Sequence, residues 1–435
     1  MIAAQVKYKK TGIDWMPEVP EHWAIVRLKN VTKIVSGATP KSSVSANWDG
    51  NINWVTPAEF GDEMYIGESV RKITKTGLES CAAALVPVGS IILSNRAPIG
   101  SLGISKVALS TNQGCKSIIP THINNYFLYF LMTLQKENLN VLGNGTTFRE
   151  LATPSLRNYK IPFPPREEQD AIASFLYDEN EKITHFIQTK QRFIELLKEQ
   201  RQSIITNAVT KGIDENAKMK ETLIGEIPKH WEVRRLKTFV SSSTNGVWGS
   251  EPKNNDDDVY CIRVADIDAL TYGISEQKLT IRNISKEDQS NRLLKKGDLI
   301  IEKSGGGELS PVGRIVIYNL DHKAVTSNFM ARLNIVKEVD SEYLYFLFSS
   351  LYSQRKNIPA IKATTGIQNI DLYEYLQIKV GVPHSILEQQ EIIKHIKTET
   401  KTLDIAISKA EREIELIKEY REAMIAEAVT GKMKL

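Results

Sequence analysis

Two histidines in matched surroundings are the first candidates for chemistry in this sequence. His22 stands in the run Pro20-Glu21-His22-Trp23, and His230 stands in Pro228-Lys229-His230-Trp231. Histidine titrates near neutral pH and is the most frequent general acid or base in enzymes. In both places, however, a tryptophan follows directly, and a shared neighbour of that size indicates a shared packing role. We therefore expect both histidines to be structural.

Other catalytic and metal-binding patterns are weak or missing. The glycine-rich runs 304–307 and 143–145 could cradle a phosphate, but neither opens a strand-to-helix unit, so turns are favoured. The sequence has no Gly-x-x-x-x-Gly-Lys phosphate loop, no His-Glu-x-x-His metal pattern, and no Asn-Pro-Pro-Tyr or Asp-Pro-Pro-Tyr run of the amino-methyltransferases. Cys81, Cys115 and Cys261 are isolated, so neither disulfides nor a zinc site is expected. We predict a binding protein with no catalytic residues and no metal ligands.

The sequence is a tandem duplication. Residues 194–201, Ile-Glu-Leu-Leu-Lys-Glu-Gln-Arg, correspond to residues 414–421, Ile-Glu-Leu-Ile-Lys-Glu-Tyr-Arg, at an offset of 220. The two Pro-x-His-Trp runs lie 208 positions apart, so the centres of the two copies differ in length. A body used twice, with similar ends and a divergent centre, is typical of a protein that binds a target in two parts.

The composition is ordinary for a globular protein in water. Of the 435 residues, 41% are hydrophobic and 25% are charged, and the net charge is +4. The apolar runs are too short to span a bilayer, and the first ten residues contain no segment like a signal peptide. We expect a cytoplasmic protein. The mild basic excess permits a polyanionic partner without requiring one.

Two β-rich segments, about residues 11–160 and 221–380, alternate with two helical ones. The β-rich segments contain short runs of strand-forming residues separated by Gly, Pro, Asn and Asp. Each then holds one apolar stretch of helical type, at 126–134 and 343–351. The fold class predicted is α+β, with two similar globular domains.

Two long helices are predicted at about residues 167–209 and 387–429. Prolines precede both, and both begin on Glu-Gln, which suits a first helical turn. Apolar residues then recur at seven-residue spacing, the pattern of a helix that packs along another long helix. The economical solution is that the two pair with each other. The paired helices would then hold the two domains at a fixed distance, or, as the alternative, form a hairpin that only joins them. Gly212 and Gly431 are expected to end the helices, and the pairing residues are expected to be Leu176, Ile183, Leu197, Ile204, Ile396, Leu403, Ile417 and Met424.

Several ordered runs carry a family resemblance. They are the openings of the two domains (19–29 and 227–237), the runs Leu93-Ser94-Asn95-Arg96-Ala97-Pro98-Ile99-Gly100 and Thr111-Asn112-Gln113-Gly114, the exit Ile161-Pro162-Phe163-Pro164-Pro165 and the helix end 201–212. With these runs in this order, the chain resembles the specificity (S) subunit of type I restriction-modification systems over nearly its whole length. The exit of the second domain, residues 380–385, departs from the pattern because it lacks the double proline.

The resemblance implies two target-recognition domains, each reading one half of a split, asymmetric DNA site. The two long helices would be antiparallel and form a coiled coil between them. The implied boundaries are 1–165 for the first domain, 166–219 for the first helix, 220–384 for the second domain and 385–435 for the second helix.

The resemblance also implies partners that supply the chemistry. This chain would be non-catalytic and would hold no cofactor. Two modification (M) subunits would bring S-adenosylmethionine, and two restriction (R) subunits would bring ATP, with Mg expected on these partners. The assembled complex would be a type I site-specific deoxyribonuclease and adenine methyltransferase.

Reading DNA requires side chains that reach base edges, chiefly Arg or Lys for guanine and Asn or Gln for adenine, while other basic residues contact phosphates. In the first domain the candidates are Asn95, Arg96, Thr146, Thr147 and Arg149, with Arg71, Lys72 and Lys75 on phosphates. In the second domain they are Lys303, Ser304, Thr364, Thr365, Gln368 and Asn369, with Arg292, Lys295 and Lys296 on phosphates. Asn112-Gln113 in the first domain and Ser327-Asn328 in the second are counterparts in the repeat, which favours a shared scaffold role for them. Each candidate has the alternative of a solvated surface residue or a turn cap.

Two other classes of function stay open at the level of sequence. A protein-binding scaffold with two repeated modules would show no salt-sensitive affinity for DNA, whereas a DNA reader would. A fused nuclease or methyltransferase lacks its motifs here, and S-adenosylmethionine binding by the isolated chain would revive it. The recognised bases do not follow from the sequence, because readout depends on loop geometry.

Overall fold

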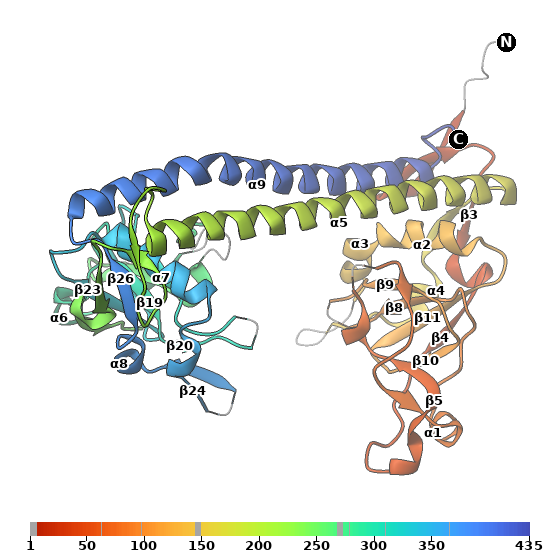
Figure 1. The fold of residues 1–435 in the computed structure, drawn as a ribbon. Coiled ribbons are helices and arrows are strands. Elements are labelled where there is room, and N and C mark those ends of the chain that lie inside the picture. The colour runs from red at the N-terminus through yellow and green to blue at the C-terminus, as the bar shows by residue number, and fades with distance from the viewer. Residues whose placement is uncertain are drawn as a thin grey trace, which may run out of the picture. The chain divides into compact units, whose positions relative to one another are not determined.

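The computed structural model describes residues 7–61, 63–96, 98–143, 149–267, 273–277, 279–308, 310–364 and 366–435, with only the backbone of Thr364. The chain divides into two compact units, Met1–Gln191 with Arg412–Leu435, and Arg192–Glu411. Each unit contains one globular module and a segment of both long helices, and both modules mix strands with helices (Figure 1). The α+β class predicted from the sequence is confirmed.

Module 1 comprises the strands β1 to β12. Its main sheet has the strand order β4-β11-β8-β9-β6, a second sheet has the order β10-β5-β7, and two pairs, β1-β2 and β12-β3, complete it. The strands are β1 (Tyr8–Ile13), β2 (Met16–Pro20), β3 (Ala24–Arg27), β4 (Thr32–Ser36), β5 (Trp48–Val55), β6 (Tyr65–Ile66), β7 (Lys72–Ile73), β8 (Ile91–Ser94), β9 (Leu102–Ser105), β10 (Leu109–Thr111), β11 (Cys115–Pro120) and β12 (Lys160–Phe163). The helices are α1 (Lys75–Glu79), α2 (Asn125–Thr133), α3 (Lys136–Val141) and α4 (Thr153–Arg157).

Module 2 comprises the strands β13 to β26. Its main sheet has the order β16-β23-β19-β21, a second has β18-β17-β22, a third has β20-β25-β24, and β13-β14 and β15-β26 form pairs. The strands are β13 (Met219–Lys220), β14 (Ile227–Pro228), β15 (Glu232–Arg235), β16 (Val240–Asn245), β17 (Asp258–Ile262), β18 (Thr280–Asn283), β19 (Leu299–Glu302), β20 (Ser304–Gly305), β21 (Ile315–Ile317), β22 (Ala324–Thr326), β23 (Met330–Ile335), β24 (Ile361–Thr364), β25 (Ile367–Ile370) and β26 (Lys379–Val382). The helices are α6 (Lys286–Ser290), α7 (Ser341–Ser353) and α8 (Leu372–Tyr375).

The two modules share a common core topology. The order β4-β11-β8-β9 in module 1 corresponds to β16-β23-β19-β21 in module 2, and each second sheet contains one parallel pair, β5 with β10 and β17 with β22. The central strands β8 and β19 are buried along their whole length. Their apolar residues account for this burial except at the strand ends, where the buried Glu302 of β19 is paired with Arg314 at 2.8 Å. The apolar helices predicted in each half are α2 and α7, and they pack on the matching strands β9 and β21.

The long helices are α5 (Arg166–Lys211) and α9 (Ile386–Val429), close to the predicted ranges. Gly212 follows α5 with φ +78° and Gly431 follows α9 with φ +74°, a conformation that suits glycine at a helix end. The first spacer was expected to reach residue 219, but α5 stops at Lys211 and the chain continues into β13. No helix in the described part of the chain is long and apolar enough to cross a membrane.

Ion pairs join α5 and α9 within each unit. In unit 2, Arg201 pairs with Asp404 at 2.8 Å and Lys198 with Glu411 at 3.9 Å, so the numbering rises along one helix while it falls along the other. In unit 1, Lys190 Nζ lies 2.5 Å from Glu413. The helices therefore pair in antiparallel fashion.

The residues expected to pair the two long helices are all buried or half-buried. The buried ones are Leu176, Ile183, Leu197, Ile396 and Met424, and the half-buried ones are Ile204, Leu403 and Ile417. Leu176 and Met424 belong to the core of module 1, and Ile396 belongs to that of module 2, so some of these residues pack on a module as well.

The end of each long helix completes the core of the other half of the sequence. Ile425, Ala428 and Val429 of α9 are buried in the core of module 1. Their counterparts at the offset of 220, Ile205, Ala208 and Val209 of α5, are buried in the core of module 2. The sequence-based boundaries kept the helices apart from the domains, whereas the compact units divide both helices for this reason.

Candidate nucleic-acid interface

Each module is joined to its long helix by one glutamate that binds the Pro-x-His-Trp run. In module 1, Trp23 Nε1 donates to Glu168 at 2.8 Å, and His22 Nε2 lies 2.7 Å from the same carboxylate. In module 2, Trp231 Nε1 donates to Glu388 at 2.7 Å, and His230 Nε2 lies 2.9 Å from it. The histidines therefore help to hold each module on its long helix, which is a structural role.

The glutamine after each of these glutamates joins two further elements. Gln169 donates to the Pro164 carbonyl at 2.8 Å and accepts from the backbone N–H of Asn124 at 2.8 Å, just before α2. Gln389 does the same with Pro383 at 3.2 Å and Asp340 at 2.7 Å, just before α7. The sequence indicated only a helix start at Glu-Gln. The contacts show that the pair holds the module on its helix.

Replacing Glu168 with alanine is expected to lower the free energy of unfolding of the chain by about 1–2 kcal/mol. The reason is that the part-buried Trp23 N–H would lose its charged acceptor. Glu167→Ala is the matched control. Glu167 directly precedes Glu168 in the same helical turn, and its side chain is exposed. Denaturant unfolding followed by tryptophan fluorescence measures both variants, and equal losses in the two would contradict this role of Glu168.

The turn that follows β10 or β22 is a shared frame in the two modules. The backbone N–H of Asn112 donates to the Val55 carbonyl at 2.9 Å, and that of Ser327 donates to the Ile262 carbonyl at 2.8 Å. A Cβ added to Gly37 would lie 2.0 Å from the Asn112 oxygen, and one added to Gly246 would lie 2.0 Å from the Ser327 oxygen. Such close backbone approach supports the scaffold role inferred for this repeated turn.

Beside this turn, two chain segments meet at an equivalent sheet edge in each module. We call the two facing residues of these segments the edge pair. In module 1, Arg96 is bridged to Glu150, and the Leu151 N–H donates to the Asn95 carbonyl at 2.9 Å. In module 2, Ser304 is paired with Asn369, and the Ile370 N–H donates to the Lys303 carbonyl at 2.9 Å. The edge pairs are therefore Arg96 with Glu150 and Ser304 with Asn369.

The edge pair of module 1 is charged. Arg96 Nε and Nη2 both lie 3.2 Å from Glu150 Oε2, and Asn95 Nδ2 donates to Glu150 Oε1 at 3.1 Å. The side chains of Arg96 and Glu150 are 50% and 45% exposed. The nearby Lys116 ammonium donates to Thr153 at 2.9 Å, and burial lowers the pKa of Lys116, with Glu150 acting in the opposite direction. Glu150 and Lys116 were not among the sequence candidates, since neither lies in a run that differs visibly from its surroundings.

The edge pair of module 2 is uncharged. Ser304 Oγ donates to Asn369 Oδ1 at 2.5 Å, and Gln368 Oε1 accepts from the Val312 N–H at 3.2 Å. Lys303 Nζ donates to Asn245 Oδ1 at 2.5 Å, and burial lowers the pKa of Lys303. The same frame therefore presents different hydrogen-bonding groups in the two modules.

The remaining sequence candidates lie elsewhere or outside the described residues. Thr146, Thr147 and Thr365 are outside the described residues, Thr364 has only its backbone described in β24, and the side chain of Arg149 is exposed. The guanidinium of Arg71 stacks on Trp48, 3.9 Å from the ring centroid. The other basic candidates have acidic neighbours: Lys72 pairs with Glu68, Lys75 with Glu79, Arg292 with Asp288 and Lys296 with Asp321, and the backbone N–H of Lys295 donates to Asp298.

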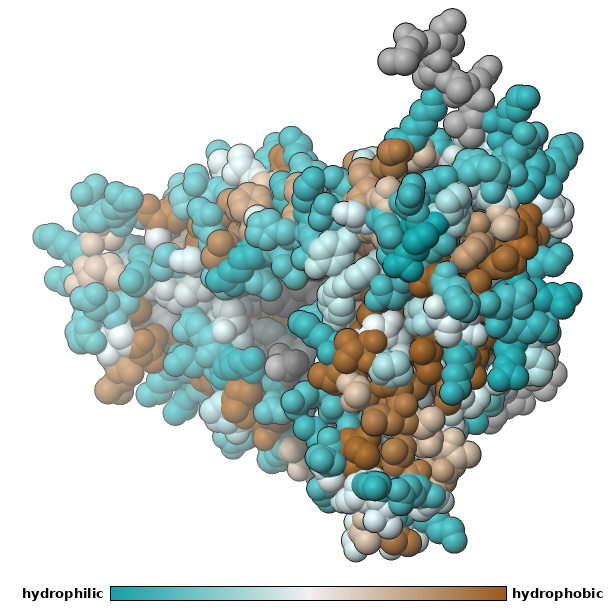
Figure 2. All heavy atoms as spheres, turned by 90° about the vertical axis from the view of Figure 1, so that its right-hand side faces the viewer, coloured by the Kyte–Doolittle hydropathy of each residue, from teal (hydrophilic) through white to brown (hydrophobic). Residues whose placement is uncertain are grey.

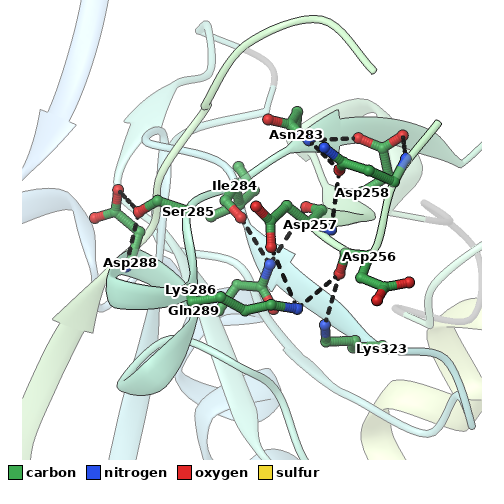
Figure 3. A network of polar contacts seen from close by, with 11 residues as sticks. Asp256, Asp257, Asp258, Asn283, Ile284, Ser285, Lys286, Asp288, Gln289 and Lys323 are labelled. Atoms are coloured by element: carbon green, nitrogen blue, oxygen red, sulfur yellow. Dashed lines mark hydrogen bonds and ion pairs between the residues drawn. The ribbon is translucent and has the colours of Figure 1, made fainter. Parts of the chain in front are cut away.

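An acidic run in module 2, Asp256 to Asp258, is held by its own neighbours (Figure 3). Lys286 Nζ lies 3.2 Å from Asp257 and donates to the Asp256 carbonyl at 3.0 Å, and Asn283 donates to Asp258 at 2.8 Å. The hydrogen bond from Asn283 holds the pKa of Asp258 below its ordinary value. These contacts hold the loop together. Within the described residues no group of three or more His, Cys, Asp or Glu side chains could hold a metal ion.

Unit 1 also carries an apolar surface. Figure 2 shows apolar residues gathered on the face of unit 1 that is turned to the viewer, between hydrophilic ones. Large exposed apolar side chains of this unit include Val70, Leu85 and Val88. These side chains carry no groups that could hydrogen-bond to a base, so the edge pairs remain the stronger candidates for reading a nucleic acid.

Comparison with known proteins assigns the chain to a family. The sequence profile described as "Type I restriction modification DNA specificity domain" matches residues 20–204 and again 228–416, which together are most of the chain. The chain belongs to the specificity-subunit family of type I restriction-modification systems. Specificity subunits of these systems are non-catalytic, and the complex carries out restriction and methylation.

Several relatives match the chain over nearly its full length. The specificity subunit of the type I restriction enzyme MjaIX of Methanocaldococcus jannaschii is 28% identical, over 99% of this chain and 97% of the relative. That of EcoKI from Escherichia coli K12 is 20% identical, over 96% of this chain and 90% of the relative. A solved chain, from work on complex assembly and conformational transition of a type I system, superposes with a TM-score of 0.65 at 15% identity, covering 95% of this chain and 99% of that chain.

Proposed function

We propose that this specificity subunit recognises a bipartite, asymmetric DNA site, with module 1 reading one half and module 2 the other. The observation that carries the proposal is the pair of matched frames with different edge pairs, Arg96–Glu150 and Ser304–Asn369. Two readers of the same build but different chemistry would recognise two different half-sites. The phosphate contacts would come from basic side chains such as Arg71 and Lys295, which are exposed.

We further propose that the long helices hold two modification subunits on equivalent surfaces. On α5, Arg192 pairs with Glu195 at 2.9 Å and Leu196 is 47% exposed. On α9, Arg412 pairs with Glu415 at 2.8 Å and Leu416 is 47% exposed. We call these two surfaces the twin patches. A solvent-facing leucine beside the same ion pair, repeated at the offset of 220, suits one partner that binds twice.

In the proposed assembly the cofactors belong to the partners. The modification subunits would hold S-adenosylmethionine, and two restriction subunits would use ATP and Mg. The chain itself would supply recognition and spacing.

Salt dependence of DNA affinity tests the reading role. We expect the full chain with its modification subunits to bind its site with a log–log salt slope of about −5, because about six phosphates would be neutralised at about −0.9 each. Lys295→Ala combined with Lys296→Ala should make the slope shallower by about 2 without changing the preferred sequence. Affinity that does not change between low and physiological salt would favour the protein-binding scaffold instead.

A further inference from the structure

We propose that the edge pair sets the base pair read at one position of each half-site. This inference rests on the proposed function. The Arg96–Glu150 pair would select a G·C pair in the half-site of module 1, and the Ser304–Asn369 pair would select an A·T pair in the half-site of module 2.

The two pairs occupy the same place in the fold. The N–H of Asn95 donates to the Gly114 carbonyl at 2.9 Å, and the N–H of Lys303 donates to the Phe329 carbonyl at 2.8 Å. On their other side both residues accept the N–H that follows the partner segment, that of Leu151 or Ile370. Backbone bonds on both sides therefore fix each pair, while the side chains are free to differ between the modules.

The chemistry of the first pair matches both bases of one G·C pair. Arginine donates two hydrogen bonds to O6 and N7 of guanine, and a glutamate accepts from N4 of the cytosine opposite. Glu150 contacts Nε and Nη2 of Arg96, and a guanidinium has five N–H donors, so the Nη1 side can still serve a guanine. Asn95 donates to Glu150 and holds the carboxylate beside the arginine.

The second pair suits adenine for the same kind of reason. The amide of an asparagine accepts from N6 and donates to N7 of adenine, and a serine hydroxyl can serve either a donor or an acceptor. Ser304 donates to Asn369 Oδ1 and so orients the amide, while the second lone pair of that oxygen can accept from a base. The uncharged pair also has no guanidinium group that could donate two hydrogen bonds to O6 and N7 of a guanine.

Exchanging the pairs tests the proposal. The double variant Arg96→Ser with Glu150→Asn gives module 1 the pair of module 2, and the amide oxygen of the new asparagine can still accept from Asn95. The measurement is long-read mapping of methylated sites in cells that carry the full chain and its modification subunits. We expect one position of the first half-site to lose its preference for G·C about tenfold to a hundredfold and to move toward A·T, while the second half-site stays the same.

Two further variants make the result decisive. The control is Lys182→Ser with Glu179→Asn, which removes an exposed ion pair on α5 and should leave the motif unchanged. If the exchange variant methylates nothing, Arg96→Lys decides, because lysine keeps the charge and loses the bidentate fork. A relaxed position in Arg96→Lys supports the proposal.

Two outcomes would overturn the inference, and a third concerns the proposed function alone. A motif identical to that of the wild type in an active exchange variant, or in Arg96→Lys, shows that the edge pair does not select the base. A wild-type complex that methylates no split motif at all would instead refute the bipartite function on which this inference rests.

Discussion

If the wild-type chain binds two modification subunits, as we propose, a Leu196→Glu variant is expected to bind one, and Leu196→Glu with Leu416→Glu is expected to bind none. Each leucine is half-exposed at the centre of a twin patch. A carboxylate buried there on binding would weaken the binding free energy of the modification subunit by at least about 2 kcal/mol. That corresponds to a loss of affinity of about thirtyfold for each subunit. Native mass spectrometry at a fixed micromolar concentration would give the stoichiometry.

Leu387→Glu is the matched control for assembly. Leu387 is 73% exposed on α9, and its counterpart at the offset of 220 is already a glutamate, Glu167. This variant should keep two modification subunits. If the double variant also keeps both, the partners do not bind the twin patches.

The second half of the chain on its own, residues 222–435, is expected to be an obligate homodimer. This half lacks Ile205, Ala208 and Val209, which are at most 2% exposed in the core of module 2. The same types recur as Ile425, Ala428 and Val429 at the end of α9. A continuous helix of 44 residues, about 66 Å long, carries that end away from its own module, so only a second copy can supply it.

Light scattering and the methylation motif check this dimer. The expected mass is twice that of the half-chain, and with modification subunits the motif should be an inverted repeat of the second half-site. Ile425→Asp with Val429→Asp in the half-chain should abolish the dimer, because two charges would enter the core of the partner module. A folded, stable monomer of the unaltered half-chain at micromolar concentration would contradict the exchange of helix ends.

The sequence predicted the parts that recur. The preceding prolines, the Glu-Gln starts and the seven-residue spacing of apolar residues located both long helices to within about two residues. The short strand-forming runs, with one apolar stretch of helical type in each half, predicted the α+β class. The helix stops at Gly212 and Gly431 also agree with the structure. Local pattern is sufficient for these features because each one depends on neighbours within a few residues.

The contacts between distant segments could not be predicted in the same way. Glu168 looked like a residue of a first helical turn, and its bond to Trp23 joins positions 145 apart. Glu150 lies in no distinctive run, and its partner, Arg96, is 54 positions earlier, so local pattern does not indicate their contact. The ends of the long helices also complete the opposite modules, which a division of the sequence into consecutive domains does not show. Such pairings are set by the packing of the sheets.

Methylation mapping of the wild-type chain with its modification subunits tests the central claim most directly. Two modules with the same fold but different edge pairs should give a motif of two short, unrelated blocks of specified bases. A spacer of fixed length and unspecified sequence should separate the two blocks. Long-read sequencing of a genome that carries the system measures this motif in one experiment. A single continuous motif, or a palindrome with identical halves, would contradict the account in which each module reads its own half-site.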